Sequence, residues 1–162
     1  MTAVTHVENQ FVFRVDASLE VAFPLFGAWG EREWAGNDWE PRFLWPWPAA
    51  DVQGEVFTVG DSEDLSIWVN TAFDLEEGHV QYVYVTPGLQ AVTIDLRLTS
   101  VAPNVTQVCV TYRRTALRPE VNEYIRELGE KDRSYGESWA TAIGACLRRS
   151  ARTGSRRLRS RS

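Results

Sequence analysis

Asp132 is the polar residue whose position best suits acid–base or ligand chemistry. It falls on the apolar stripe of an expected C-terminal helix, four residues after Leu128 and three before Tyr135. A regular helix would aim this carboxylate inward, to anchor a ligand hydroxyl or amine or to act as a general acid or base with a raised pKa. Alternatively, Gly129 and Gly136 shift the helix and leave Asp132 in solvent.

Other kinds of chemistry have little material in this sequence. His6 lies near the terminus and His79 beside a turn glycine, a poor basis for a metal site or a histidine-based triad. The glycines do not form a phosphate-binding loop. Cys109 and Cys146 lie in strand-like and helix-like runs, so we expect reduced core thiols. We therefore expect no metal and no cofactor, and the sequence identifies no catalytic residue.

Aromatic side chains make up the remaining candidates. The chain has seven tryptophans, seven phenylalanines and five tyrosines, and five tryptophans fall within residues 27–48. Each buried ring removes about 150–250 Å² from water, worth on the order of 4–6 kcal/mol. The rings therefore fill a plain core or line a binding cavity. Those we nominate as lining a cavity are Trp34, Trp39, Phe43, Trp68, Tyr135 and Trp139.

A cavity of this kind must be filled. A dry void of about 300 Å³ would cost about 7 kcal/mol, so we expect water, ligand or collapsed rings inside it. The sequence leaves the orientation of Tyr82 and Tyr84 open, because Val83 and Val85 offer an equally apolar opposite face. An acidic cluster lies among the tryptophans, and either rims a pocket for a cationic ligand or forms a solvated loop: Glu31, Glu33, Asp38 and Glu40.

The first elements that must position these groups follow from the hydrophobic pattern. Residues 6–17 alternate as in a half-buried strand, and Ser18 is a suitable N-cap for a short helix that Pro24 ends early. Residues 27–48, rich in glycine and proline, predict loops and short helical turns, with an edge strand near residues 42–45.

A strand meander and a long helix complete the predicted order. After Pro119 the apolar period changes to about 3.6, which predicts one amphipathic helix over residues 120–149, with a bend or interruption near its two glycines. Turn residues divide the preceding part of the chain into five strands, at residues 54–59, 65–73, 79–86, 89–101 and 106–116.

The last two strands predict their own register. A three-residue loop at residues 103–105 keeps both apolar sets on one side of the sheet. The expected partners are Leu98 with Val110, Leu96 with Tyr112, and Asp95 with Arg113 on the opposite face.

This order of elements resembles the START-like superfamily, which includes birch-allergen-type proteins, polyketide cyclases and lipid-transfer domains. The likeness spans about residues 6–149, and small bacterial members are the most similar. It implies an α+β helix-grip fold, with a curved antiparallel sheet around the long C-terminal helix and a cavity for apolar molecules between them, but no shared active-site residues. The residues that carry it are 11–15 (FVFRV), 18–26 (SLEVAFPLF), 30–34 (GEREW), 39–44 (WEPRFL) and 112–139.

Charge is unevenly distributed along the chain. Residues 148–162 contain seven arginines and no acid, and because the whole chain carries a formal charge of −5, the other residues carry −12. An acidic body argues against nucleic acid on the folded surface. We expect a domain at residues 1–149 and a disordered basic tail at residues 150–162, which either binds an anionic partner or has none.

Three functions stay open from the sequence. The first is binding or carriage of a small apolar ligand, the second a polyketide cyclase or aromatase-type reaction on such a ligand, and the third protein interaction without a ligand. The sequence contains no apolar run of the roughly 20 residues that a membrane span needs and no signal-peptide pattern. We therefore expect a cytoplasmic protein without an integral membrane segment.

Overall fold

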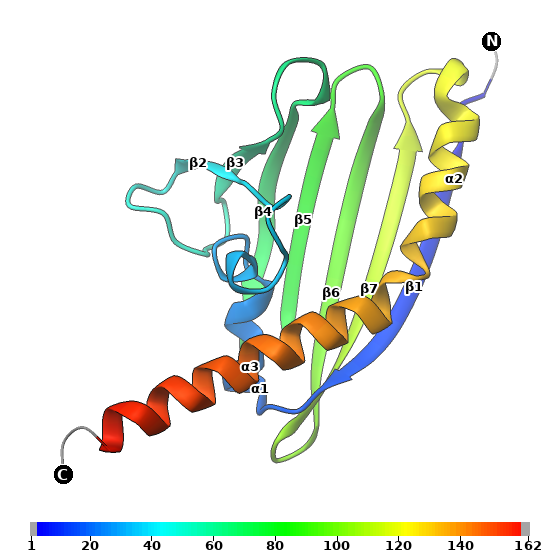
Figure 1. Ribbon diagram of the computed structural model, residues 1–162. Coiled ribbons are helices and arrows are strands. Elements are labelled where there is room, and N and C mark those ends of the chain that lie inside the picture. Colours follow the sequence, from blue (N-terminus) through cyan, green and yellow to red (C-terminus); the bar gives the residue numbers. More distant parts are fainter. Residues whose placement is uncertain (1–2, 160–162) are drawn as a thin grey trace.

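One open antiparallel sheet of seven strands dominates the computed structural model, which describes residues 3–159 (Figure 1). Its strand order is β1-β7-β6-β5-β4-β3-β2, so β2 to β7 form a meander and β1 pairs with β7. The strands are β1 His6–Val15, β2 Arg42–Trp45, β3 Val56–Val59, β4 Ser66–Asp74, β5 His79–Thr86, β6 Gln90–Ala102 and β7 Val105–Ala116.

The two long helices cover one face of this sheet. Helix α3 (Tyr135–Arg159) crosses the sheet, and α2 (Asn122–Asp132) lies along β1 and β7 (Figure 1). This is the predicted α+β helix-grip architecture. The short elements are α1 Leu19–Ala22 and the 3-10 turns η1 Phe23–Phe26, η2 Gly30–Glu33, η3 Ser62–Asp64 and η4 Pro119–Val121.

The strand alternation and the helix cap that the sequence predicted are both present in the structure. In β6 the inward residues Val92, Ile94 and Leu96 are buried, while the side chains between them face outward and are partly exposed. The Ser18 hydroxyl accepts a hydrogen bond from the backbone N–H of Val21 (3.4 Å) and caps α1. The edge strand predicted near residues 42–45 is β2.

The predicted register of β6 and β7 is wrong by two residues. The hairpin turn is tighter than expected, because Ala102 pairs with Val105, and a bulge between Ser100 and Ala102 adds the second residue of the shift. A two-residue shift leaves every side chain on its predicted face, so the apolar pattern could not detect it. Asp95 therefore lies opposite Thr111 rather than Arg113, and its carboxylate contacts His79 on β5 (2.6 Å). The observed partners are Leu98 with Val108, Leu96 with Val110, Ile94 with Tyr112, and Asp95 with Thr111.

The helix predicted over residues 120–149 is interrupted between Gly129 and Gly136, where a bend or interruption was expected. Two residues separate α2 from α3, and both glycines lie where the helices meet β1. A Cβ on Gly129 would come within 2.8 Å of Val7 Cγ2, and one on Gly136 within 3.3 Å of Phe11 Cδ2. The glycines therefore allow close approach of helix to strand, in addition to weakening the helix.

The arginine-rich end continues α3 where the sequence predicted a disordered tail. The helix extends to Arg159 and projects beyond the sheet (Figure 1). Backbone hydrogen bonds alone extend a helix in this way, and side chains 150–156 are all exposed. Residues 160–162 of the predicted tail lie outside the described residues. No helix within the described part of the chain is long and apolar enough to cross a membrane.

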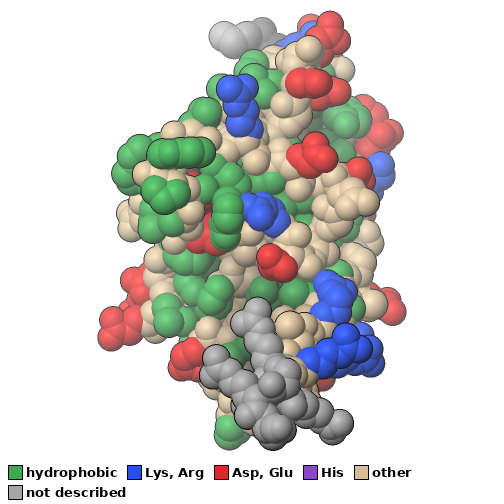
Figure 2. Space-filling view, turned by 60° about the vertical axis from the view of Figure 1, so that its left-hand side comes forward, with side chains coloured by type: hydrophobic (Ala, Val, Ile, Leu, Met, Phe, Trp, Pro, Cys, Tyr) green, Lys and Arg blue, Asp and Glu red, His purple; other side chains and the backbone are tan. Residues whose placement is uncertain are grey.

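The tryptophan-rich segment divides between interior and surface. Trp34 is buried and Trp39 half-buried, whereas Trp29, Trp45 and Trp47 are exposed, the last with 84% of its surface in solvent. Figure 2 shows hydrophobic side chains gathered on this side of the molecule. The sequence did not distinguish the buried tryptophans from the exposed ones, because both kinds lie among similar glycine- and proline-rich turns.

Both cysteines are unpaired. Cys146 is buried in α3, as predicted for a core thiol, whereas Cys109 faces outward from β7 and is partly exposed. The inward neighbours Val108 and Val110 are fully buried. The strand alternation therefore places Cys109 outside the core.

Candidate functional site

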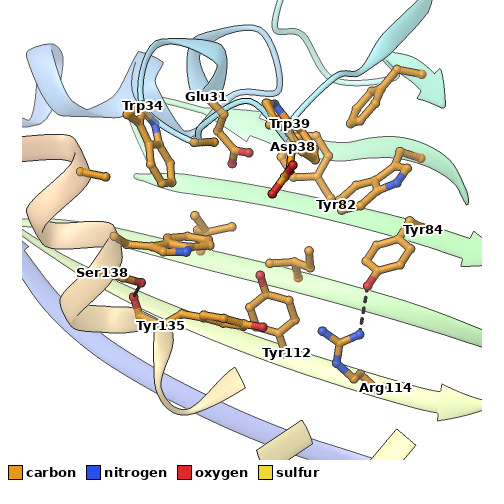
Figure 3. A pocket seen from close by; sticks show the side chains of 17 residues that line it. Glu31, Trp34, Asp38, Trp39, Tyr82, Tyr84, Tyr112, Arg114, Tyr135 and Ser138 are labelled. Atoms are coloured by element: carbon orange, nitrogen blue, oxygen red, sulfur yellow. Dashed lines mark hydrogen bonds between the residues drawn. The ribbon is translucent and has the colours of Figure 1, made fainter. Parts of the chain in front are cut away.

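A cavity of about 570 Å³ lies between the sheet, α3 and the segment that follows η1 (Figure 3). This volume is within the usual range for small-molecule sites. The sheet contributes Phe57, Trp68, Tyr82, Tyr84, Ile94, Leu96, Tyr112 and Arg114, the segment after η1 contributes Glu31, Trp34, Ala35, Asp38 and Trp39, and α3 contributes Tyr135, Ser138, Trp139 and Ala142.

Tryptophan rings form the apolar walls and brace one another. Trp139 meets Trp34 edge to face with 5.2 Å between ring centroids, and Trp39 meets Trp68 in the same way at 5.6 Å. The indole N–H of Trp34 donates to the backbone oxygen of Leu25 (2.6 Å), and those of Trp39 and Trp68 also have protein acceptors. These three rings therefore offer a ligand their apolar surface and no free N–H.

A buried hydrogen-bond network forms one polar end of the cavity. Arg114 donates from Nε and Nη2 to both carboxylate oxygens of Asp132 (2.7 and 2.8 Å). Its Nη1 donates to the Tyr84 hydroxyl and to the side-chain oxygen of Gln90, both at 3.0 Å. Burial lowers the pKa of Arg114, but the hydrogen bonds that it donates to Asp132 outweigh this effect and raise that pKa above its ordinary value. The guanidinium is therefore charged and already paired.

Carboxyl groups gather around Glu31, which lines the other end of the cavity, whereas Asp51 and Glu55 lie behind it and outside the lining. The Asp51 carboxylate accepts hydrogen bonds from the backbone N–H groups of Trp29 (2.7 Å) and Gly30 (3.1 Å). Glu55 is fully buried, and neither of its carboxyl oxygens has a hydrogen-bond partner among residues 3–159. Burial, and then the charge of Asp51, raise the pKa of Glu55 to about 8. Burial and these two acids likewise raise the pKa of Glu31, which faces the cavity.

These carboxyls do not form a metal site. In the part of the chain that the structure describes, no group of three His, Cys, Asp or Glu side chains is arranged to hold a metal ion. With Glu55 protonated at neutral pH, this end of the cavity carries less negative charge than the sequence suggests.

Solved structures with the same architecture identify the fold. A Staphylococcus aureus protein of unknown function aligns with a TM-score of 0.68 and 14% identity, over 92% of this chain and 98% of that chain. The Zhui aromatase/cyclase from a Streptomyces species aligns with a TM-score of 0.61 and 16% identity, over 91% and 96% of the two chains. This chain has the START-like helix-grip fold. Norcoclaurine synthase from Thalictrum flavum, solved with dopamine and hydroxybenzaldehyde, shares this START-like fold with a TM-score of 0.60 and 9% identity, over 89% and 86%. No protein-family model and no curated protein matches the sequence.

The START-like fold brings together most of the residues nominated from the sequence. Phe43 lies outside the cavity, between the rings of Trp29 and Phe57 at 5.4 and 5.7 Å. Asp132 is 1% exposed, so its carboxylate points inward, as predicted for a regular helix, and not into solvent; it pairs with Arg114 and does not itself line the cavity. The nominated residues that line the cavity are Trp34, Trp39, Trp68, Tyr135 and Trp139.

The structure also places the residues whose orientation the sequence left undecided. Both Tyr82 and Tyr84 point inward and line the cavity. In the acidic cluster, Glu31 and Asp38 line the cavity, whereas Glu33 is exposed on η2. The cluster therefore divides between a pocket wall and a solvated turn.

Sequence reasoning missed Arg114, the central polar group of this START-like cavity. A signal was present in β7, because Arg114 continues the inward series of Val108, Val110 and Tyr112. A charged residue on the buried face of a strand needs a buried partner. Asp132 is the acid on the apolar stripe of the C-terminal helix, and the structure shows that these two buried charged residues are each other's partners.

Proposed function

We propose that this protein binds a small, predominantly apolar molecule between its sheet and α3. The observation that carries the proposal is a cavity of about 570 Å³ walled by four tryptophan rings, three of which, those of Trp34, Trp39 and Trp68, already have protein acceptors for their N–H groups. The cavity is partly open to solvent, so water occupies it when no ligand is bound. Release of that water from the apolar walls favours an apolar ligand.

The structures that share the fold support the choice of ligand size. Norcoclaurine synthase was solved with dopamine and hydroxybenzaldehyde, which are single-ring compounds, and the Zhui protein is an aromatase/cyclase. The fold thus accommodates small aromatic molecules, although their chemistry does not transfer to this chain on fold alone.

Titration of the purified protein with naphthalene, followed by tryptophan fluorescence and calorimetry, tests the proposal. We expect saturable binding with a negative heat-capacity change, which marks burial of apolar surface. Ala142→Phe should fill the cavity from α3 and abolish binding, whereas Thr141→Phe on the exposed side of the same helix should bind normally. Equal binding by both variants, or no binding of naphthalene by the unmodified protein, would contradict the proposal.

A second candidate function is proton transfer to or from the bound molecule. The observation that favours it is Glu31, a carboxyl that faces the cavity with a raised pKa. Compounds co-purifying with the protein should be identified by mass spectrometry and incubated with fresh protein. Conversion that stops in Glu31→Gln, while binding continues, would establish catalysis, and release of the compound unchanged would leave carriage alone.

A further inference from the structure

The arginine at the polar end of the cavity has one unused hydrogen-bond donor. A guanidinium has five N–H groups. Arg114 uses four of them, two toward Asp132, one toward Tyr84 and one toward Gln90. The fifth, on Nη2, has no acceptor within residues 3–159. Because Arg114 lines the cavity, a ligand atom there is the available partner.

Tyrosine hydroxyls add further donors at the same end. The Tyr84 hydroxyl accepts from Arg114, which leaves its own proton without a partner among the described residues. Figure 3 shows the hydroxyls of Tyr84, Tyr112 and Tyr135 on the same side of the cavity as the Arg114 guanidinium. Burial raises the pKa values of Tyr84 and Tyr112, so both phenols are neutral donors.

The charge balance of this end selects against anions. Asp132 already pairs with Arg114 through both of its oxygens, and both residues are buried. A carboxylate ligand would therefore bring an uncompensated negative charge into a site of low polarity, at a large desolvation cost. A neutral oxygen would accept the free N–H and O–H donors without that cost.

We propose that the ligand carries a neutral oxygen acceptor, such as a ketone carbonyl, that binds Arg114 Nη2 and the neighbouring tyrosine hydroxyls while its apolar body lies among the tryptophan rings. The inference rests on the proposed binding function and narrows its ligand class. It excludes plain hydrocarbons as the preferred ligands, and it excludes carboxylates of the same shape.

Three compounds of one shape test this selectivity. They are 2-acetylnaphthalene, its hydrocarbon analogue 2-isopropenylnaphthalene, and 2-naphthoate, each titrated into the intact protein. We expect the ketone to bind at least tenfold more tightly than the hydrocarbon, about the effect of one hydrogen bond, and more tightly than the carboxylate. The carbonyl stretching band of the bound ketone should shift to lower frequency than in a hydrocarbon solvent.

Variants assign the effect to this end of the cavity. Tyr84→Phe and Tyr112→Phe should each reduce the ratio of ketone to hydrocarbon affinity, and the charge-balanced double variant Arg114→Met/Asp132→Leu should reduce it furthest. Tyr124→Phe, an exposed tyrosine on α2, is the matched control and should keep the ratio. Circular dichroism before each titration verifies that the variant is folded.

The outcomes separate this inference from the proposed function. If the ketone and the hydrocarbon bind equally well, or the carboxylate binds most tightly, the oxygen site is overturned while the binding function stands. If none of the three compounds binds, the proposed function itself fails.

Discussion

The pair formed by Arg114 and Asp132 predicts a strong dependence of stability on its charge balance. Asp132→Asn leaves the guanidinium buried without a counter-charge, so we expect a loss of about 3–5 kcal/mol in the free energy of unfolding. The double variant Arg114→Met/Asp132→Leu removes both charges and should recover most of that loss. Urea unfolding of the three proteins at pH 7 measures both effects, and a single variant as stable as the unmodified protein would contradict the expectation.

Glu55 predicts a dependence of stability on pH. Its carboxyl keeps its proton in the folded state up to a pKa of about 8, whereas the ordinary value is 4.5. Between these values the unfolded state binds fewer protons, so the free energy of unfolding falls as pH rises from about 4.5 to about 8. The slope from one group is at most about 1.4 kcal/mol per pH unit.

Glu55→Gln isolates this contribution. The neutral amide resembles the protonated carboxyl, so the variant should match the unmodified protein at about pH 4, below the ordinary pKa, and exceed its stability at about pH 8. Urea unfolding across this range gives both values. Glu63→Gln, at an exposed position in η3, is the control and should leave the pH slope unchanged. Parallel slopes for the unmodified protein and Glu55→Gln would show that Glu55 titrates alike in both states.

The sequence predicted the location of a side chain where the hydrophobic pattern of its own element determined which way it faces. Trp34 and Trp139 were nominated for the cavity from their positions alone, and both line it. Asp132 was identified as unusual, but its partner lies on a different element, the strand β7, 18 residues earlier in the chain. Periodicity assigns a face to a residue and says nothing of what it meets there, so the polar end of the cavity needed the structure.

At the scale of elements, the sequence predicted which segments form strands and helices better than how they meet. Alternation and turn residues located the strands of the meander. The register of β6 and β7 depends on a two-residue turn together with a bulge between Ser100 and Ala102, and the two irregularities together keep the apolar face that the expected three-residue loop would also have given. The break between α2 and α3, in contrast, lies between Gly129 and Gly136, where the sequence predicted a bend or interruption.

The loop between β2 and β3 predicts a local effect on the cavity wall. Asp51 attaches this loop to the backbone of Trp29 and Gly30, and a Cβ on Gly27 would come 2.1 Å from the Asp51 Cγ. Asp51→Ala and Gly27→Ala should both break this contact. We expect amide hydrogen exchange at Trp29 and Gly30 to become about 10- to 100-fold faster in each variant.

Two comparisons make that prediction specific. Asp61→Ala, an exposed acid before η3, should leave exchange at these amides unchanged. Faster exchange throughout the sheet would indicate general destabilisation instead of a loosened loop. Unchanged exchange in both Asp51→Ala and Gly27→Ala would mean that the carboxylate does not hold this segment.

At the scale of the whole molecule, fold and composition answer different questions. The order of apolar patterns predicted the helix-grip architecture because each segment had one consistent period. The acidic body and the arginine-rich end could not predict where the domain stops, since net charge constrains partners and not folding. The structure extends α3 to Arg159, and the boundary at residue 149 stays a prediction.

Truncation after Arg149 tests that boundary. Arg149 donates from Nη2 to the backbone oxygen of Glu33 (3.1 Å), and the side chains of residues 150–156 beyond it are exposed. We therefore expect the shortened chain to unfold within about 0.5 kcal/mol of the full chain and to bind naphthalene with the same affinity. A chain ending at Gly144 also loses the buried Cys146, and should be markedly less stable. If truncation after Arg149 costs more than about 1 kcal/mol, the arginine-rich end of α3 belongs to the folded domain and the boundary lies further along the chain.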